Sequence, residues 1–223
     1  RWFEIRNDIR SAVKRCIETL GSNLIVKPVH FGSSIGIAVT HSNVELEKAL
    51  LSASFVDSEV LVEKLLSNFV EYNCAVREID NELEVSEIER PLSQEAILSF
   101  AEKYQHGDKN AARQGMASLK RELPARISDA LKVNIEETAR RVFRVARLSS
   151  MARIDFMYSE NEILYLTEIN SIPGSLAFYL WESKGISYPD QLTALIENAK
   201  KEQAHTDSQM FDHHSDIVEK FID

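Results

Sequence analysis

The chain of 223 residues has the composition of a soluble globular protein, with 44% hydrophobic and 27% charged residues. Its formal net charge of -9 argues against a general affinity for nucleic acid, so any anionic ligand must be held by a local site. No segment approaches the roughly 18 uninterrupted apolar residues of a membrane span, and charges near the start interrupt any signal-peptide core, so we expect a cytoplasmic protein with no membrane partner.

The first half of the chain mixes helical and extended patterns. Apolar residues at helical spacing predict one amphipathic helix ahead of Gly21, and Cys16 within it, like Cys74 further on, is expected to be a buried thiol. Ser42 and Asn43 predict a helix start. The expected elements are helix 5–20, strands 24–28 and 37–40, helix 43–53, strand 60–64 and a hairpin of strands 72–77 and 82–86.

The second half begins with a stretch that has no periodicity. Residues 100–124 predict a long loop, and loops of this length in compact domains are usually functional lids or disordered segments. Ser128 is expected to cap a helix that runs to about Leu148, with an inward stripe of Leu131, Ile135, Val142 and Val145. A hairpin at 151–170, a Pro173-Gly174 turn, a helix at 189–201 and a polar tail with a short helix complete the prediction.

The hairpin at 151–170 is the most informative segment. Turn residues at 158–163 separate two runs rich in Ile, Phe, Tyr and Leu. Because side chains on a strand alternate between faces, one face is expected to carry four polar residues and the other six that pack. The polar four are Arg153, Asp155, Glu168 and Asn170, and the packing six are Ile154, Phe156, Tyr158, Ile163, Tyr165 and Ile169.

The polar face of this hairpin predicts a metal and phosphate site. Hard cations such as Mg²⁺ take oxygen ligands, usually one or two carboxylates together with substrate phosphates. Asp155, Glu168 and the Asn170 carbonyl supply such oxygens from neighbouring strands. The alternative from these residues alone is a set of cross-strand pairs that only solvate a sheet face.

Two further segments suggest contacts with a nucleotide. Lys27 ends a strand and precedes the Gly/Ser loop 32–36, whose backbone N–H groups can approach phosphate oxygens; the alternative is a plain hairpin turn. Glu63 and Lys64 end another strand, where an adenine can bond to backbone groups and to a nearby acid such as Glu71. The alternative there is a surface ion pair worth about 0–1 kcal/mol.

Together the three blocks resemble the ATP-grasp enzymes, and within them the D-alanine:D-alanine ligases. The stretch VKPVHFGSSIGI is similar to their phosphate loop, VLVEKLL to their adenine hinge, and MARIDF with LTEINSIPG to their metal and oxyanion segments. The resemblance covers residues 20 to about 200. It implies an α+β ATP-grasp fold whose antiparallel sheets grip the nucleotide, with ATP and Mg²⁺ or Mn²⁺ as cofactors and D-alanine as substrate, in peptidoglycan precursor synthesis for the cell wall.

The resemblance also implies roles for individual residues. Catalysis would use Arg153, the Gly174 amide, Ser33 and Tyr104. ATP would contact Lys27, Ser34, Glu63, Lys64, Leu66, Glu71 and Lys103. The metal would be held by Asp155, Glu168 and Asn170, and the second substrate's carboxylate by Ser175 and Leu176.

The sequence also departs from the family's pattern. The family carries an amino-terminal domain and a further nucleotide-binding lysine, and neither fits ahead of Leu24, so we expect the 223 residues alone to turn over little or no substrate. The segment after Pro173-Gly174 is short, which leaves D-lactate or D-serine open as second substrates. The other alternative is a nucleotide-binding module without catalysis.

The expected organisation is a small central subdomain at 1–68, incomplete at its start, a large subdomain at 69–201 and a tail at 202–223. The family's members are commonly dimers, which makes a homodimer a candidate assembly.

Overall fold

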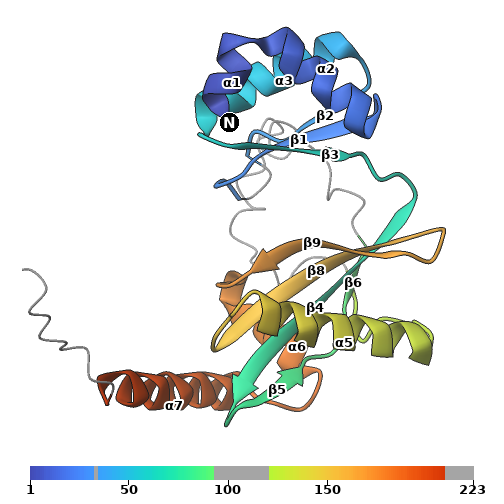
Figure 1. Ribbon diagram of the computed structural model, residues 1–223. Helices are drawn as coiled ribbons and strands as arrows, with labels where there is room; N and C mark the ends of the chain where they lie inside the picture. The colour runs from blue at the N-terminus through green and yellow to red at the C-terminus, as the bar shows by residue number, and fades with distance from the viewer. Residues whose placement is uncertain (33–34, 93–120, 209–223) are drawn as a thin grey trace, which may run out of the picture. The chain divides into compact units, whose positions relative to one another are not determined.

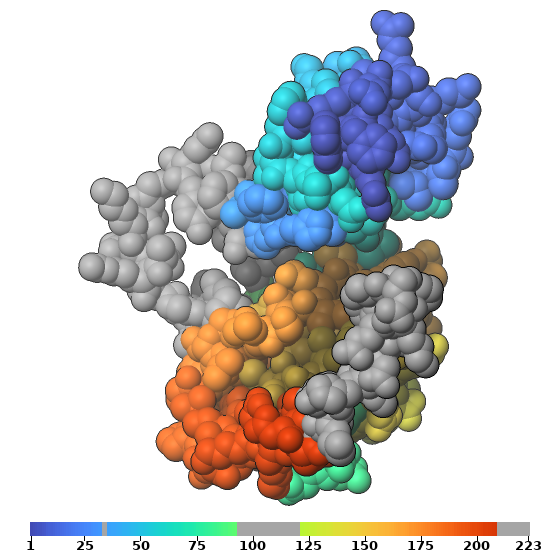
Figure 2. Space-filling view, turned by 60° about the vertical axis from the view of Figure 1, so that its left-hand side comes forward, coloured from blue at the N-terminus to red at the C-terminus, as the bar shows by residue number. Residues whose placement is uncertain are grey.

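A computed structural model describes residues 1–32, 35–92 and 121–208, and the remaining residues are grey in Figure 2. The described residues form two compact units. The first unit holds residues 1–70, Leu92 and the hairpin tip 158–163, and the second holds residues 71–91, 121–157 and 164–208.

The first unit is a three-stranded sheet covered on one face by helices (Figure 1). The strand order is β2-β1-β3, and both pairings are antiparallel, with Val26 opposite Ala38 on one side and opposite Val62 on the other. Its elements are α1 (Trp2–Asn7), α2 (Ile9–Leu20), β1 (Leu24–Pro28), β2 (Ala38–Thr40), α3 (Asn43–Val56) and β3 (Val60–Lys64).

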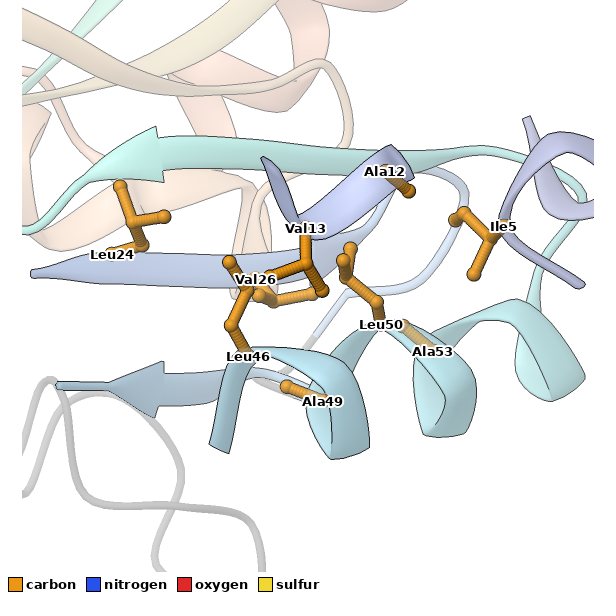
Figure 3. Packing of buried hydrophobic residues seen from close by; sticks show 9 residues of the cluster. All are labelled: Ile5, Ala12, Val13, Leu24, Val26, Leu46, Ala49, Leu50 and Ala53. Atoms are coloured by element: carbon orange, nitrogen blue, oxygen red, sulfur yellow. The ribbon is translucent and has the colours of Figure 1, made fainter. Parts of the chain in front are cut away.

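The core of the first unit lies between that sheet and the helices (Figure 3). Alternate residues of β1, Leu24 and Val26, are fully buried and pack against α2 and α3, while Ile25 and Lys27 lie on the opposite face. The helices contribute the rest of the cluster, which consists of Ile5, Ala12, Val13, Leu46, Ala49, Leu50 and Ala53. One face of the sheet is therefore used for packing, and the other carries polar side chains.

The prediction of a single helix before Gly21 is wrong, because the helix is interrupted at Asp8. Asp8 has φ -148° and ψ 81°, and its side chain accepts a hydrogen bond from the Ser11 backbone N–H. Asp is a strong N-cap residue, and here it ends α1 and starts α2. Apolar spacing runs through such a break, so periodicity alone did not reveal it. The stop at Gly21 is confirmed, with φ 88°.

The second unit is built on a four-stranded sheet with the order β5-β4-β8-β9. Asp80 and Asn81, both with positive φ, join β4 to β5, which confirms the hairpin turn expected there. The elements are β4 (Phe69–Ile79), β5 (Glu82–Val85), β6 (Arg90–Pro91), β7 (Arg121–Glu122), α5 (Asp129–Val145), β8 (Met151–Ser159), β9 (Leu164–Asn170), the 3-10 turn η3 (Gly174–Ala177), α6 (Phe178–Glu182) and α7 (Tyr188–Asp207).

Strands β6 and β7 and the short helix α6 were not expected from the sequence. Strands β6 and β7 pair antiparallel, and β7 falls inside the stretch expected to be a loop as far as residue 124. The residues of α6 are nearly all apolar or aromatic, and Leu180 and Trp181 are fully buried, so α6 closes the core of this unit. A five-residue helix has too few residues to show a helical period.

Two helix predictions needed correction. Val145 is 77% exposed, and the buried stripe of α5 is Ile135, Ala139 and Phe143. Helix α7 continues to Asp207, beyond the end expected at residue 201, and its last turns are polar and exposed. Within the described residues, no helix is long and apolar enough to cross a membrane.

Candidate functional site

Lys27 and Glu63 meet on the helix-free face of the first unit's sheet. Glu63 pairs in register with Ile25, so its side chain is diagonal to Lys27 on the same face. The Lys27 Nζ lies 2.5 Å from the Glu63 Oε2, and their side chains are 27% and 44% exposed. A cation and an acid are thus adjacent at a half-open surface, where both can reach a ligand.

Asp57 anchors the start of the loop that follows Lys27. Its carboxylate accepts the His30 backbone N–H at 2.6 Å and lies 2.8 Å from the His30 Nδ1. The hydrogen bond from the His30 backbone N–H is the main reason why the pKa of Asp57 lies well below its usual range. In the other direction, the hydrogen bond to Asp57 raises the pKa of the His30 imidazole. Sequence reasoning missed Asp57, because it lies 27 residues from the loop it holds.

The segment at the end of β3 is the one that the sequence predicts as an adenine hinge. Lys64 is exposed, Leu66 is half-buried, and the backbone N–H of Leu65 donates to the Asn23 carbonyl at 2.9 Å, which fixes the chain as it leaves the strand. Glu71 is half-buried near the start of β4.

Arg153, Asp155 and Asn170 come together on β8 and β9 of the second unit. The Arg153 Nε and Nη2 each donate to one Asp155 oxygen at 2.7 Å, and the Asn170 Nδ2 donates to the Asp155 Oδ2 at 3.0 Å. The Arg153 and Asp155 side chains are only 13% and 15% exposed. Burial disfavours the charged guanidinium, but the hydrogen bonds and charge of Asp155 outweigh it and raise the pKa of Arg153.

The alternation expected for this hairpin holds on β8 and fails on β9. Ile154 and Phe156 are buried, whereas Tyr165 is 41% and Ile169 36% exposed, and Ile163, just before β9, is 48% exposed. Strand β9 is the last strand of the sheet that the structure describes, and among these residues it has a neighbouring strand on one side only. Glu168 is exposed and lies two residues from Asn170, on the same side of β9.

The Pro173-Gly174 turn leads into η3, where the residues expected to meet the second substrate lie. Gly174 and Ser175 are exposed, and Leu176 is half-buried. Ser175 and Leu176 both have φ 52°, an unusual conformation for residues with a side chain. Ser33, Ser34, Lys103 and Tyr104 lie outside the described residues.

Glu89 is the centre of a second polar cluster that the sequence did not predict. Its carboxylate, 4% exposed, accepts hydrogen bonds from the Tyr179 hydroxyl at 2.9 Å, Arg121 Nη1 at 3.0 Å and Asn73 Nδ2 at 3.2 Å. The Arg121 guanidinium also lies 4.0 Å from the centre of the Tyr179 ring. These contacts join residues up to 90 positions apart, so no local pattern in the sequence reveals them.

The Glu89 cluster is electrostatically linked to Arg153. Burial, followed by the charge of Glu89 and its hydrogen bond, raises the pKa of the Tyr179 hydroxyl, and the positive charge of Arg153 acts in the opposite direction. Glu89 and Tyr179 in turn contribute to the raised pKa of Arg153. Arg153 therefore interacts with acidic groups of both clusters.

The donor set on β8 and β9 fits a hard divalent cation. It offers the Asp155 carboxylate, a neighbouring Asn170 amide and the exposed Glu168, all oxygen-bearing side chains of the kind that Mg²⁺ and Mn²⁺ take together with phosphate oxygens and water. No group of three or more His, Cys, Asp and Glu side chains suited to a metal occurs in the described part of the chain. Two carboxylates and an amide fit a metal that also needs ligands from a substrate.

The sequence of the chain is similar to that of known proteins. The family model described as the D-ala D-ala ligase C-terminus matches residues 2–197. A D-alanine--D-alanine ligase from Thermosipho melanesiensis is 35% identical over 195 residues, which are 87% of this chain and 51% of that protein. The chain spans about half the length of the curated relatives it matches.

Solved structures support the fold. The D-alanine-D-alanine ligase from Coxiella burnetii superposes with a TM-score of 0.72 at 22% identity, over 90% of this chain and 51% of that one. A D-Ala:D-Ser ligase from Enterococcus faecalis gives a TM-score of 0.69 at 29% identity, over 86% of this chain and 54% of that one. These matches confirm the expected α+β ATP-grasp fold.

Proposed function

The chain belongs to the family of D-ala D-ala ligase C-terminal regions, and on that premise we propose that it is the nucleotide-binding and catalytic part of an ATP-dependent ligase that joins two D-alanines. The observation that carries the proposal is the joining of Arg153, Asp155 and Asn170 by hydrogen bonds across β8 and β9. A solvating sheet face would not need a bidentate pair that is about 85% buried.

ATP is proposed to contact the residues that the family resemblance assigns to it. Lys27 would bind the α- and β-phosphates, and Glu63 the adenine amino group, so the ion pair between them would open when ATP binds. Lys64 and Leu66 would offer backbone bonds to the adenine ring, and Glu71 would reach the ribose. We place Ser34 and Lys103 at the phosphates, and Ser33 and Tyr104 near the first amino acid, on the family resemblance alone.

Asp155, Glu168 and Asn170 are proposed to hold Mg²⁺ or Mn²⁺. When bound, the metal would neutralise charge on the phosphate oxygens of ATP. Arg153 orients the Asp155 carboxylate, and the backbone carbonyl of Asp155 accepts a hydrogen bond from the Thr167 hydroxyl at 2.9 Å. Asp155 is therefore held in position on β8 without a ligand. Such preorganisation reduces the cost of assembling the site.

The proposed reaction has two steps. The carboxylate of the first D-alanine takes the γ-phosphoryl group of ATP, giving an acyl phosphate and ADP. The amine of the second D-alanine then attacks the acyl carbon, a tetrahedral oxyanion forms beside Arg153 and the Gly174 amide, and inorganic phosphate leaves as the peptide bond forms. The Arg153 guanidinium is positively charged at any physiological pH, so it can face the oxyanion as a cation.

D-Serine is the alternative second substrate. The support for it is the similarity to the Enterococcus faecalis D-Ala:D-Ser ligase together with the short segment that separates Gly174 from α6. We propose the subdomain limits 1–68 and 69–201 and a homodimeric assembly as parts of the same model.

The proposal is tested first by binding. Isothermal titration of this chain with ATP should show binding in the presence of Mg²⁺ that is at least tenfold weaker with EDTA and in Asp155→Asn. Glu82→Gln, which changes an exposed acid on β5, is the matched control and should bind like the wild type. Equal binding by Asp155→Asn would contradict the proposed metal site.

The substrate is tested with the complete gene product. Phosphate release should require ATP and D-alanine, and mass spectrometry should identify the dipeptide. Replacing half of the D-alanine by D-serine or D-lactate distinguishes the alternatives by product mass. ATP binding without any phosphate release on these substrates would support a nucleotide-binding module instead.

A further inference from the structure

The turn after Pro173-Gly174 holds three consecutive side-chain-bearing residues in the left-handed region. The φ values of Ser175, Leu176 and Ala177 are 52°, 52° and 47°. L-residues visit this region singly, because the Cβ approaches the following carbonyl, and a run of three persists only when its surroundings fix it. The Leu176 backbone N–H donates to the Pro173 carbonyl at 2.9 Å, which fixes one side of the turn.

Gln191 of α7 contacts the same turn from the interior. Its side chain is 0% exposed, and its Nε2 donates to the Leu176 carbonyl at 3.0 Å. The same Nε2 lies 3.1 Å from the Met151 Sδ. Met151 is the first residue of β8, two positions before Arg153, so one amide group contacts both the turn and the strand that carries the site.

The oxygen of the Gln191 amide, Oε1, is buried and makes no compensating hydrogen bond among the described residues. Burying an unsatisfied amide oxygen is unfavourable, so an apolar side chain of the same length would suit the core better. What such a side chain could not supply is the hydrogen bond from Nε2 to the turn.

We propose that Gln191 is a positioning residue that holds the Ser175–Ala177 turn in the conformation that receives the amine substrate. The inference rests on the function proposed above and on the family resemblance, which implies that Ser175 and Leu176 meet the carboxylate of the second amino acid. The Leu176 carbonyl belongs to the planar peptide group between Leu176 and Ala177, so fixing its direction also fixes the direction of the Ala177 N–H in that group.

The test compares Gln191→Met with wild type. Methionine keeps the volume and removes the donor, and Asn198→Met is the matched control. Asn198 is also buried on α7, but among the described residues its amide donates only within the helix, to Glu202 Oε1 at 3.3 Å. The two measurements are hydrogen exchange of the peptide that covers residues 172–180 in this chain, and steady-state kinetics of the complete gene product.

We expect the amides of residues 176 and 177 to exchange at least tenfold faster in Gln191→Met. The KM for the amine substrate should rise at least tenfold, while the KM for ATP and kcat stay within about twofold, because the phosphate-binding groups are untouched. A purely structural loss would instead lower the melting temperature and the amount of active enzyme without separating the two KM values. Asn198→Met should leave both the exchange and the KM for the amine unchanged.

Unchanged exchange in Gln191→Met overturns the inference, whatever the activity. Faster exchange with an unchanged KM for the amine overturns it too, because the turn would then not position the substrate. Failure of the proposed function would be recognised separately, as wild-type protein that releases no phosphate with ATP and D-alanine. The exchange measurement needs no activity and still decides whether Gln191 holds the turn.

Discussion

Asp155 receives three hydrogen bonds from two side chains at a position that is only 15% exposed. A charge held in this way is sensitive to the loss of one partner, because the remaining partner keeps its desolvation cost without the compensating contact. Asp155 and Arg153 are proposed to have different roles in catalysis: Asp155 would bind the metal, and Arg153 would face the oxyanion. The stability contribution and the catalytic contribution of this pair can therefore be measured apart.

Removing both members of the Arg153–Asp155 pair should destabilise the protein by less than the sum of the two single removals. Arg153→Met and Asp155→Asn are each expected to lower the free energy of unfolding by about 1–3 kcal/mol, and the double variant by less than the sum of the two. Urea unfolding of the four proteins gives the coupling energy. Strict additivity would show that the bidentate contact contributes nothing to folding.

His30 and Asp57 make a second residue-scale prediction, on pH. The folded pKa of Asp57 is lowered, so its stabilisation is complete above its unfolded pKa of about 3.9 and is lost as the pH falls through the folded value. The folded pKa of His30 is raised, so its stabilisation is complete below its unfolded pKa of about 6.5 and is lost as the pH rises through the folded value. The pair should therefore stabilise most between about pH 4 and 6.5.

The measurement is the melting temperature against pH for wild type and His30→Gln. The difference between them should be largest in that window and should shrink on both sides of it. Introducing His30→Gln into an Asp57→Asn background is the control, because the carboxylate that bonds the imidazole is then absent and only the weaker influence of Glu59 remains. A pH-independent difference between the first two proteins would show that the contact is not ionic.

Among the elements, the loop between β1 and β2 depends on one glycine. Gly36 has φ +72°, and a Cβ built there would lie 2.8 Å from the Pro28 Cγ, closer than such atoms approach in proteins. Gly32, in the same loop, has no heavy atom of the described residues within 4 Å of the equivalent position and no positive φ. The two glycines therefore differ sharply in what a methyl group would meet.

Gly36→Ala should destabilise the chain by about 1–3 kcal/mol, and Gly32→Ala should stay within about 0.5 kcal/mol. Both are measured by urea unfolding of this chain. Because Gly36 ends the loop that is proposed to bind phosphate, its substitution should also weaken ATP binding. Equal effects of the two substitutions would show that neither the positive φ nor the approach to Pro28 constrains the loop.

How far the sequence predicted these elements depends on the range of the interactions that define them. Strands β1 and β3 were predicted with their observed limits, because Pro28 and Lys64 mark the strand ends locally. The helix break at Asp8 was not predicted, because the apolar residues keep their helical spacing on both sides of Asp8. Arg153, Asp155 and Asn170 could be grouped by strand alternation, whereas Glu89 and Gln191 could not, since their partners come from distant segments.

At the scale of the whole molecule, the described residues form two units with separate cores. Each unit contains one of the two tryptophans: Trp2, 43% exposed, in the first, and Trp181, fully buried, in the second. Domains that do not share a core need not unfold in one step. The two indoles therefore offer independent reports on unfolding.

Leu50→Ala should lower the stability of the first unit alone. Leu50 is 2% exposed in that unit's core, and truncating a buried leucine to alanine costs about 2–5 kcal/mol. In urea, the fluorescence transition of Trp2, followed in a Trp181→Phe background, should move to lower concentration. The transition of Trp181, followed in a Trp2→Phe background, should stay in place. Ile154→Ala, in the core of the second unit, should reverse the pattern, and a common shift of both transitions would show that the units unfold as one cooperative body.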